Sequence, residues 1–193
     1  MREAILERIT KETAIKLRLN LDSAGESSIK TGIGFFDHML TLFAFRAGIT
    51  LEVTCEGDLE VDGHHTVEDV GITLGQAIAK ALGDKRGIAR YGDVTLPMDE
   101  TLVNAALDIS GRPYLVFHAK FPVPRLGDFE TELVEEFFRA LVLHAGLTLH
   151  INLVYGSNTH HIAEAIFKAC GAAFGKAVAL TGDTNIPSTK GVL

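Results

Sequence analysis

GHHTVEDVG at residues 63–71 and THHIAEAIF at residues 159–167 carry the same short pattern, His-His-x-x-Glu, at corresponding places in the two halves of a 193-residue chain. Each His-His pair follows a polar loop and begins an apolar-periodic run, as expected at the start of a helix. One copy of so short a pattern is weak evidence. Two copies at corresponding places predict that the chain contains an internal repeat.

Two further landmarks recur in the same order. Glu12-Thr13 opens the run ETAIKLRLNLD, and Glu100-Thr101 opens ETLVNAALDIS. Ala47-Gly48 and Ala145-Gly146 each join a helix-like run to a strand-like run. Glycine directly after a helix favours the left-handed conformation that ends it. Three landmarks in one order are hard to explain by chance, so we predict one half-repeat over residues 1–92 and another over 93–193, together forming one compact catalytic unit.

The hydrophobic periodicity predicts the same elements in each half. Leucine and isoleucine at 15, 17, 19 and 21 alternate with polar residues, the period of a half-buried strand. In the first half we expect strands near 12–22, 27–31 and 49–56 and helices near 35–47 and 64–82. In the second half we expect strands near 102–109, 114–121 and 147–155 and helices near 129–145 and 160–180. The predicted fold class is α+β: two tandem β-β-α-β-α half-domains with the helices packed between two outer sheets.

Composition excludes several classes of protein. The net charge of −7 argues against general nucleic-acid binding, which needs a basic surface to displace counterions. There is no run of 18 apolar residues and no apolar N-terminal signal, so we expect no membrane association and a soluble, cytoplasmic protein. The two cysteines form neither a disulfide framework nor a Cys-based metal pattern.

The two His-His-x-x-Glu helices predict a metal site. Positions i and i+4 of a helix share one face, whereas i+1 points about 100° away. His64 and Glu68 can therefore chelate one ion while His65 serves another, and the same holds for the second copy. If the two helices face each other, two equivalent three-ligand sites result. Imidazole and carboxylate without thiolate suit Mn(II), Fe(II), Co(II) or Zn(II), and spacing does not choose among them.

A fourth ligand to each ion is expected from the other helix of each half. His38 precedes Ala47-Gly48, and counting back equally from Ala145-Gly146 reaches Glu136. His144 lies two turns beyond Glu136 on nearly the same face. The repeat selects Glu136, whereas residue type alone selects His144.

Several longer motifs resemble those of the imidazoleglycerol-phosphate dehydratases over nearly the whole chain. They are TGIGFFDHML at 31–40, HHTVED at 64–69, LGDKRGIARYG at 82–92, LPMDE at 96–100, ALDISGRPYL at 106–115 and PSTKGVL at 187–193. The resemblance implies a hydro-lyase of histidine biosynthesis that removes water from imidazole glycerol phosphate and uses two Mn(II) ions per active site. It also implies a homo-oligomer of 24 subunits with active sites at the interfaces.

The resemblance implies particular ligands as well. One ion would be held by His38, His65, His160 and Glu164, and the other by His64, Glu68, Glu136 and His161. Many family members have histidine where this chain has Glu136, which is an acceptable Mn(II) ligand. The substrate would contact Glu12, with Arg90, Arg112, Ser188 and Lys190 around its phosphate.

The acid and base groups are expected to be carboxylates. We assign proton transfer to Glu12, Glu68 and Glu164, and we expect Asp99 to orient metal ligands. Two other functions share part of this pattern: a di-metal hydrolase acting on a phosphate ester, and a non-enzymatic metal-binding module. Phosphate release would identify the former, and phosphate donors that do not converge on the ions would favour the latter.

Overall fold

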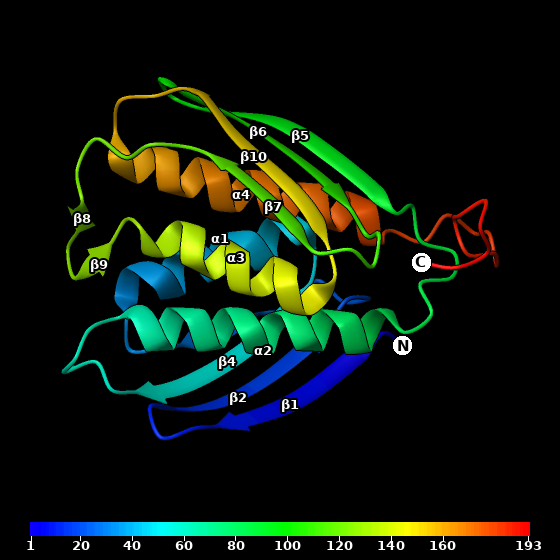
Figure 1. Cartoon of the computed structure of the whole chain (residues 1–193), viewed down its shortest axis with the longest axis horizontal. Coiled ribbons are helices and arrows are strands. Elements are labelled where there is room, and N and C mark those ends of the chain that lie inside the picture. The colour runs from blue at the N-terminus through cyan, green and yellow to red at the C-terminus, as the bar shows by residue number, and fades with distance from the viewer.

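The structure is a computed structural model that describes all 193 residues. Two four-stranded sheets form its outer layers, and four helices lie between them (Figure 1). The first half consists of β1 (Glu3–Ile9), β2 (Thr13–Asn20), β3 (Ser28–Lys30), α1 (Gly34–Ala47), β4 (Thr50–Gly57) and α2 (His64–Leu82). The second half consists of β5 (Tyr91–Met98), β6 (Thr101–Asp108), β7 (Tyr114–His118), β8 (Arg125–Leu126), β9 (Phe129–Glu130), α3 (Leu133–Ala145), β10 (Thr148–Tyr155) and α4 (Thr159–Val178). The predicted α+β class and layer order are confirmed.

The two sheets have the same construction. Their strand orders are β1-β2-β4-β3 and β5-β6-β10-β7, with the last pair parallel in each and the others antiparallel. On β2, Ile15, Leu17 and Leu19 are buried and the residues between them are exposed. This alternation places one face of the sheet against the helices and the other in solvent. None of the helices is long and apolar enough to span a membrane.

Three sequence expectations need correction. The strands β1 and β5 were not predicted, so each half contains an additional first strand, and β5 begins just before the expected boundary at 92. The pattern of β1 is obscured because Ile5 and Ile9 lie on its exposed face. The helix expected from Phe129 begins at Leu133, because residues 125–130 form a small hairpin whose turn holds Gly127 at φ +60°.

The helices pair across the two halves. α2 packs chiefly against α3, and α4 packs chiefly against α1. Each pair approaches most closely at a glycine in a corresponding place: a Cβ on Gly75 would lie 2.7 Å from the Leu141 carbonyl oxygen, and one on Gly171 would collide with the Phe43 carbonyl. The condition for two equivalent three-ligand sites, that the two His-His-x-x-Glu helices face each other, is therefore not met within one chain, since α3 lies against α2 and α1 lies against α4.

A polar network joins β1 to α2 on the side of α2 that faces the first sheet. The Arg8 guanidinium donates to Asp69 Oδ1 from Nη2 at 2.8 Å, and Thr13 Oγ1 donates to Asp69 Oδ2 at 2.5 Å. Asp69 is almost completely buried. In the second half, Leu96 and Ala165 stand at the corresponding positions, so the same packing site is apolar there.

Replacing Asp69 with alanine is expected to lower the free energy of unfolding by about 2–3 kcal/mol, because the Arg8 charge would lose its partner at a mostly buried site. The double variant Arg8→Leu/Asp69→Ala reproduces the apolar pair of the second half and should recover most of that loss. Denaturant unfolding at one fixed protein concentration tests this. Equal destabilisation of the single and double variants would contradict it.

Candidate functional site

The first cluster of predicted site residues lies where α1 and α4 begin. Asn158 caps α4, its side-chain oxygen accepting from the backbone N–H of His160 at 2.9 Å. His38 Nε2 and His160 Nε2 lie 3.1 and 2.9 Å from Glu164 Oε1. The i and i+4 positions of α4 thus share one face, as predicted, and α1 adds His38 to it.

Glu164 is the electrostatic centre of this cluster, and only 10% of its side chain is exposed. Lys168 Nζ donates to Glu164 Oε2 at 2.5 Å. Burial alone would raise the pKa of Glu164, but hydrogen bonds from Lys168, His160 and His38 lower it to about 2. Glu164 is therefore a carboxylate at neutral pH, and its Oε1 is the atom on which two imidazoles converge.

The corresponding residues of the other helix pair lie on α2 and α3. Asp62 accepts from the backbone N–H of His64 at 2.8 Å and so caps the start of α2. Glu136 occupies the first turn of α3, where its counterpart His38 occupies that of α1, and its carboxylate lies 3.6 Å from Arg139 Nε. His144 lies in the last turn of α3 beside Gly75, about two turns of helix from the level of Glu68.

The second histidine of each pair points away from these faces and is held by a carboxylate. His65 Nδ1 lies 2.9 Å from Asp58 Oδ2, and its Nε2 lies 3.7 Å from Glu12 Oε1. The hydrogen bond with Asp58, together with the negative charges of Asp58 and Glu12, raises the pKa of His65.

His161 has a matching environment. Its Nδ1 lies 2.8 Å from Glu100 Oε2, and this contact chiefly raises the pKa of His161. Asp99 was expected to orient a metal ligand. Its Oδ2 lies 3.7 Å from His161 Nε2, so it does not hold the ring through Nδ1. The residue that holds the ring through Nδ1 is Glu100.

The eight predicted metal ligands do not come together in one chain. No group of three or more His, Cys, Asp or Glu side chains in the chain forms a site that could hold a metal ion. His38, His160 and Glu164 come nearest to one, as three donors in direct contact. His65 and His161 make their contacts with Asp58, Glu12, Asp99 and Glu100 instead.

The predicted phosphate ligands lie at the opposite end of the helices. Arg90 donates to Asp108 through Nε at 2.8 Å and to the Pro187 carbonyl through Nη1 at 2.9 Å, which anchors the C-terminal segment containing Ser188 and Lys190. Arg112 lies near the same carboxylate, with Nη2 3.9 Å from Asp108 Oδ2. The arginine side chains expected near phosphate are thus brought together by one aspartate.

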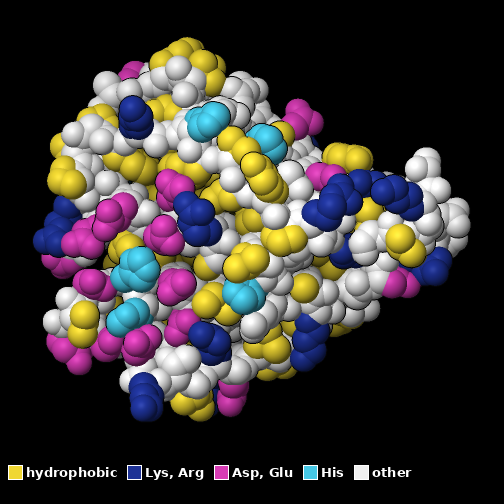
Figure 2. Space-filling model, in the orientation of Figure 1, with side chains coloured by type: hydrophobic (Ala, Val, Ile, Leu, Met, Phe, Trp, Pro, Cys, Tyr) yellow, Lys and Arg dark blue, Asp and Glu magenta, His cyan; other side chains and the backbone are white.

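The two ends are far apart. The Arg90 backbone N–H donates to the Ala177 carbonyl near the end of α4, whereas His160 is at its beginning. A helix rises 1.5 Å per residue, so these ends lie about 25 Å apart. Figure 2 shows the contrast in charge: Asp, Glu and His side chains gather on the left, and Lys and Arg side chains cluster beside the C-terminal segment on the right.

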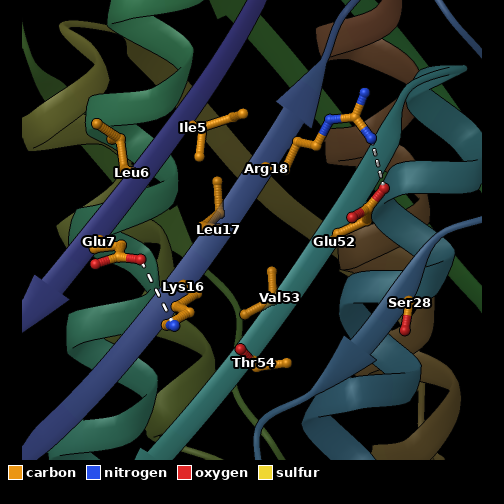
Figure 3. Close-up of a pocket in the computed structure, with 10 residues that line it drawn as sticks. All are labelled: Ile5, Leu6, Glu7, Lys16, Leu17, Arg18, Ser28, Glu52, Val53 and Thr54. Atoms are coloured by element: carbon orange, nitrogen blue, oxygen red, sulfur yellow. Dashed lines mark hydrogen bonds and ion pairs between the residues drawn. The ribbon is translucent and has the colours of Figure 1, made fainter.

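A shallow hollow on the outer face of the first sheet lies away from both ends (Figure 3). Its charged residues pair with one another, Arg18 with Glu52 at 3.1 Å and Lys16 with Glu7 at 3.7 Å. None of the predicted site residues lines it. The predicted site residues therefore lie at the ends of the helices and not in this hollow.

Four residues in contact with the predicted site were missed by sequence reasoning: Lys168, Asp58, Glu100 and Asp108. Lys168 had a readable signal, because it stands four residues after Glu164 and so on the same helix face. The three carboxylates had no such signal, because none shares a helix with its partner: seven residues separate Asp58 from His65, 18 separate Asp108 from Arg90 and 61 separate Glu100 from His161.

The comparisons with known proteins agree with this arrangement of motifs. The sequence profile of the imidazoleglycerol-phosphate dehydratases matches residues 31–174. The imidazoleglycerol-phosphate dehydratase of an Exiguobacterium species is 60% identical over 191 residues, covering 99% of this chain and 98% of the relative. The chain belongs to the imidazoleglycerol-phosphate dehydratase family. The Azorhizobium caulinodans dehydratase is 59% identical and covers 100% of this chain and 99% of that protein.

Solved dehydratase structures have the same fold. The Staphylococcus aureus imidazoleglycerol-phosphate dehydratase superposes with a TM-score of 0.85 at 46% identity, covering 93% of this chain and 99% of that one. The enzyme from Pyrococcus furiosus superposes with a TM-score of 0.84 at 38% identity, covering 97% and 100%. The resemblance stated from the motifs is thereby confirmed over nearly the full length.

Proposed function

We propose that this dehydratase-family chain removes water from imidazole glycerol phosphate, giving imidazole acetol phosphate in histidine biosynthesis, at a site assembled from more than one copy of the chain. The observation that carries this proposal is the separation of about 25 Å between the His/Glu end and the arginine end. The substrate spans less than about 10 Å, since only a few bonds of about 1.5 Å join its ring to its phosphate. The His/Glu end and the arginine end of one copy are therefore too far apart to contact the same substrate molecule.

The charges of the two ends support such an assembly. Asp and Glu side chains gather with His at one end, and Lys and Arg side chains cluster at the other (Figure 2), where Arg90 and Arg112 both lie beside Asp108. Oppositely charged surfaces from different copies attract each other when the copies associate. Arg112 has 69% of its side chain exposed and can contact a phosphate brought by a neighbouring copy. We propose that the assembly is the 24-subunit homo-oligomer implied by the sequence motifs.

The residues at the first cluster fit a divalent transition metal. Adjacent ligands in an octahedral shell with bonds of about 2.1 Å lie about 3 Å apart, and His38 Nε2 and His160 Nε2 lie 3.1 and 2.9 Å from Glu164 Oε1. Two imidazoles and a carboxylate are a suitable donor set for Mn(II). Each helix pair, α1 with α4 and α2 with α3, would form one such set. The proposed ligands are His38, His160 and Glu164 with His65 of another copy, and His64, Glu68 and Glu136 with His161 of another copy.

Glu136 rather than His144 is proposed as the fourth donor, by analogy with His38. Gly75 and Gly171 make matching contacts in the two helix pairs, so α3 lies along α2 as α1 lies along α4. In that correspondence the contact of His38 with Glu164 maps onto Glu136 with Glu68. His144 is at the level of Gly75 instead.

When bound, the two Mn(II) ions would act as Lewis acids that make the imidazole ring of the substrate a better electron acceptor. This need follows from the reaction, because the carbon that loses its proton has no neighbouring carbonyl. The C–H bond at the central carbinol carbon and the C–O bond at the ring-attached carbon break, and the resulting enol becomes the ketone.

The chain's carboxylates are assigned the proton transfers. Glu12 is half exposed at the β1–β2 turn, and its Oε1 lies 3.7 Å from His65 Nε2, the nitrogen proposed to bind an ion, which supports a role for Glu12 in proton transfer. We assign it the proton on the carbon chain. Glu68 and Glu164 are assigned proton movement to and from the leaving hydroxyl while they hold the ions. Arg90, Arg112, Ser188 and Lys190 bind the phosphate and so orient the substrate.

Mixing two inactive variants tests the assembled site. His160→Ala disables the His/Glu end, and Arg112→Ala disables the arginine end. If each site takes these ends from different copies, a randomly mixed oligomer of equal parts should regain up to about a quarter of wild-type turnover, because about a quarter of its sites combine two intact ends. Dissociation, mixing, reassembly with Mn(II) and assay of keto product would measure it.

Each variant treated alone in the same way is the control and should stay inactive. Mixed oligomers without recovered turnover would contradict a site shared between copies. Release of inorganic phosphate in place of the keto product would instead identify a phosphate-ester hydrolase.

A further inference from the structure

Glu12 and Glu100 occupy the same position in the two halves, each directly before the threonine that begins the second strand. Their side chains nevertheless have different surroundings. The Glu100 carboxylate accepts hydrogen bonds from the loop that leads into α4 and from His161. The Glu12 carboxylate makes no hydrogen bond, and its charged neighbour is His65, whose Nε2 lies 3.7 Å from Oε1. The pair therefore offers a comparison of two roles within one chain.

Glu100 connects the start of β6 to the loop before α4 and to His161. Its Oε2 accepts from His161 Nδ1 at 2.8 Å, and its Oε1 accepts from the backbone N–H of Asn158 at 2.7 Å and of Ser157 at 3.2 Å. The pKa of Glu100 is lowered, chiefly by the hydrogen bond from His161. With Nδ1–H donated to Glu100, His161 keeps Nε2 as the nitrogen that can bind an ion.

In the first half a different residue holds the imidazole. Asp58, the first residue after β4, lies 2.9 Å from His65 Nδ1 through Oδ2, and its backbone N–H donates to the Glu12 carbonyl at 3.0 Å. The corresponding residue after β10 is Ser157, because Gly156 matches Gly57: a Cβ on Gly156 would meet Thr101 and Ile162, and one on Gly57 would meet Thr13 and Thr66. Serine has no carboxylate, and its backbone N–H donates to Glu100 Oε1 at 3.2 Å, so Glu100 contacts the imidazole in this half.

We infer that Asp58 and Glu100 are equivalent positioning residues placed at different positions of the repeat, and that Asp58 releases Glu12 from the tethering role that Glu100 fulfils in the second half. The inference rests on the proposed function, in which His65 and His161 bind metal. It explains why only one of two repeat-related glutamates is available to the substrate. Each tether acts through a histidine and touches neither substrate nor ion.

Mn(II) binding to the assembled full-length protein tests this inference. Asp58→Ala and Glu100→Ala should each weaken Mn(II) affinity by about 10–100-fold, the usual effect of removing a carboxylate that orients a metal-binding histidine. Asp58→Asn and Glu100→Gln retain an oxygen that accepts the Nδ1 proton and should recover much of the affinity. Glu12→Gln should bind Mn(II) like the wild type while its kcat falls.

Glu60→Gln, which removes the same charge from an exposed position in the loop of Asp58, is the matched control and should bind Mn(II) normally. Thermal melting of the metal-free variants identifies any alanine variant that fails to fold. In that case the Mn(II) affinity of Asp58→Asn or Glu100→Gln is used in its place. Unchanged Mn(II) affinity in the alanine variants, or equal loss in Glu12→Gln, would overturn the inference. If the wild-type chain itself bound no Mn(II), the proposed metal function would fail, and this inference with it.

Discussion

The Glu164→Gln variant is expected to lose at least about a thousand-fold in kcat/KM. Glu164 Oε1 is the one atom approached by both His38 and His160, and the carboxylate also receives Lys168. Glutamine nearly preserves the volume but removes the negative charge that balances a divalent ion. The steady-state rate of keto product formation and the Mn(II) content of the same preparation measure the effect.

The Glu68→Gln variant should show a similar loss, because Glu68 corresponds to Glu164 in the other helix pair. Glu7→Gln on the outer face of the first sheet, far from both ends, is the control for removal of one charge (Figure 3). Near-normal activity and Mn(II) content in Glu164→Gln would show that the cluster of α1 and α4 does not hold a catalytic ion.

The Glu12→Gln variant is expected to lose about 10²–10⁴-fold in kcat, the usual contribution of a general acid or base. Its KM should change little, since the residues proposed to bind the phosphate lie at the other end of a different copy. Its Mn(II) content should remain that of the wild type, because Asp58 and not Glu12 holds His65. Steady-state kinetics with metal analysis separates these quantities.

Glu12→Asp provides a second measurement. Aspartate keeps the acidic group but shortens the side chain by one methylene, so partial activity is expected. A Glu12→Gln variant with full kcat would remove Glu12 from the proton transfers. A variant that lost its Mn(II) would show that Glu12 contributes to the metal site instead.

The elements of the fold were predictable wherever local periodicity matched burial. On β2 the alternation of leucines with charged residues coincides with alternating burial. On β1 it does not, because Ile5 is exposed on the outer face and Arg8 points inward to Asp69. The start of α3 was misplaced because Phe129 continues a helical apolar pattern although it lies in a hairpin strand. On β1 the contact of Arg8 with the distant Asp69 outweighed the local pattern, and at Phe129 the pairing with Leu126 in a short hairpin did so.

The candidate site was predictable in part. The i, i+4 spacing of His160 and Glu164 follows from helix geometry, and the repeat related His38 to Glu136. The carboxylates that hold His65 and His161 were not predictable, because Asp58 and Glu100 stand at non-equivalent positions. Asp58 reaches His65 from the loop before α2, whereas Glu100 reaches His161 from the turn before β6, and the spacing of the repeat does not distinguish these two arrangements.

Thus the sequence by itself determined the family, the α+β class and the residue types at the candidate site, because short-range periodicity and motif spacing act within single elements. Only the tertiary structure decided which elements meet. The close approach at Gly75 pairs α2 with α3, and the close approach at Gly171 pairs α4 with α1. The two His-His-x-x-Glu helices, α2 and α4, therefore do not pair with each other. The length of α4 then holds the His/Glu end about 25 Å from the arginine end. Because backbone contact and helix length set these positions, the two motifs that define the family do not form one site in a single chain.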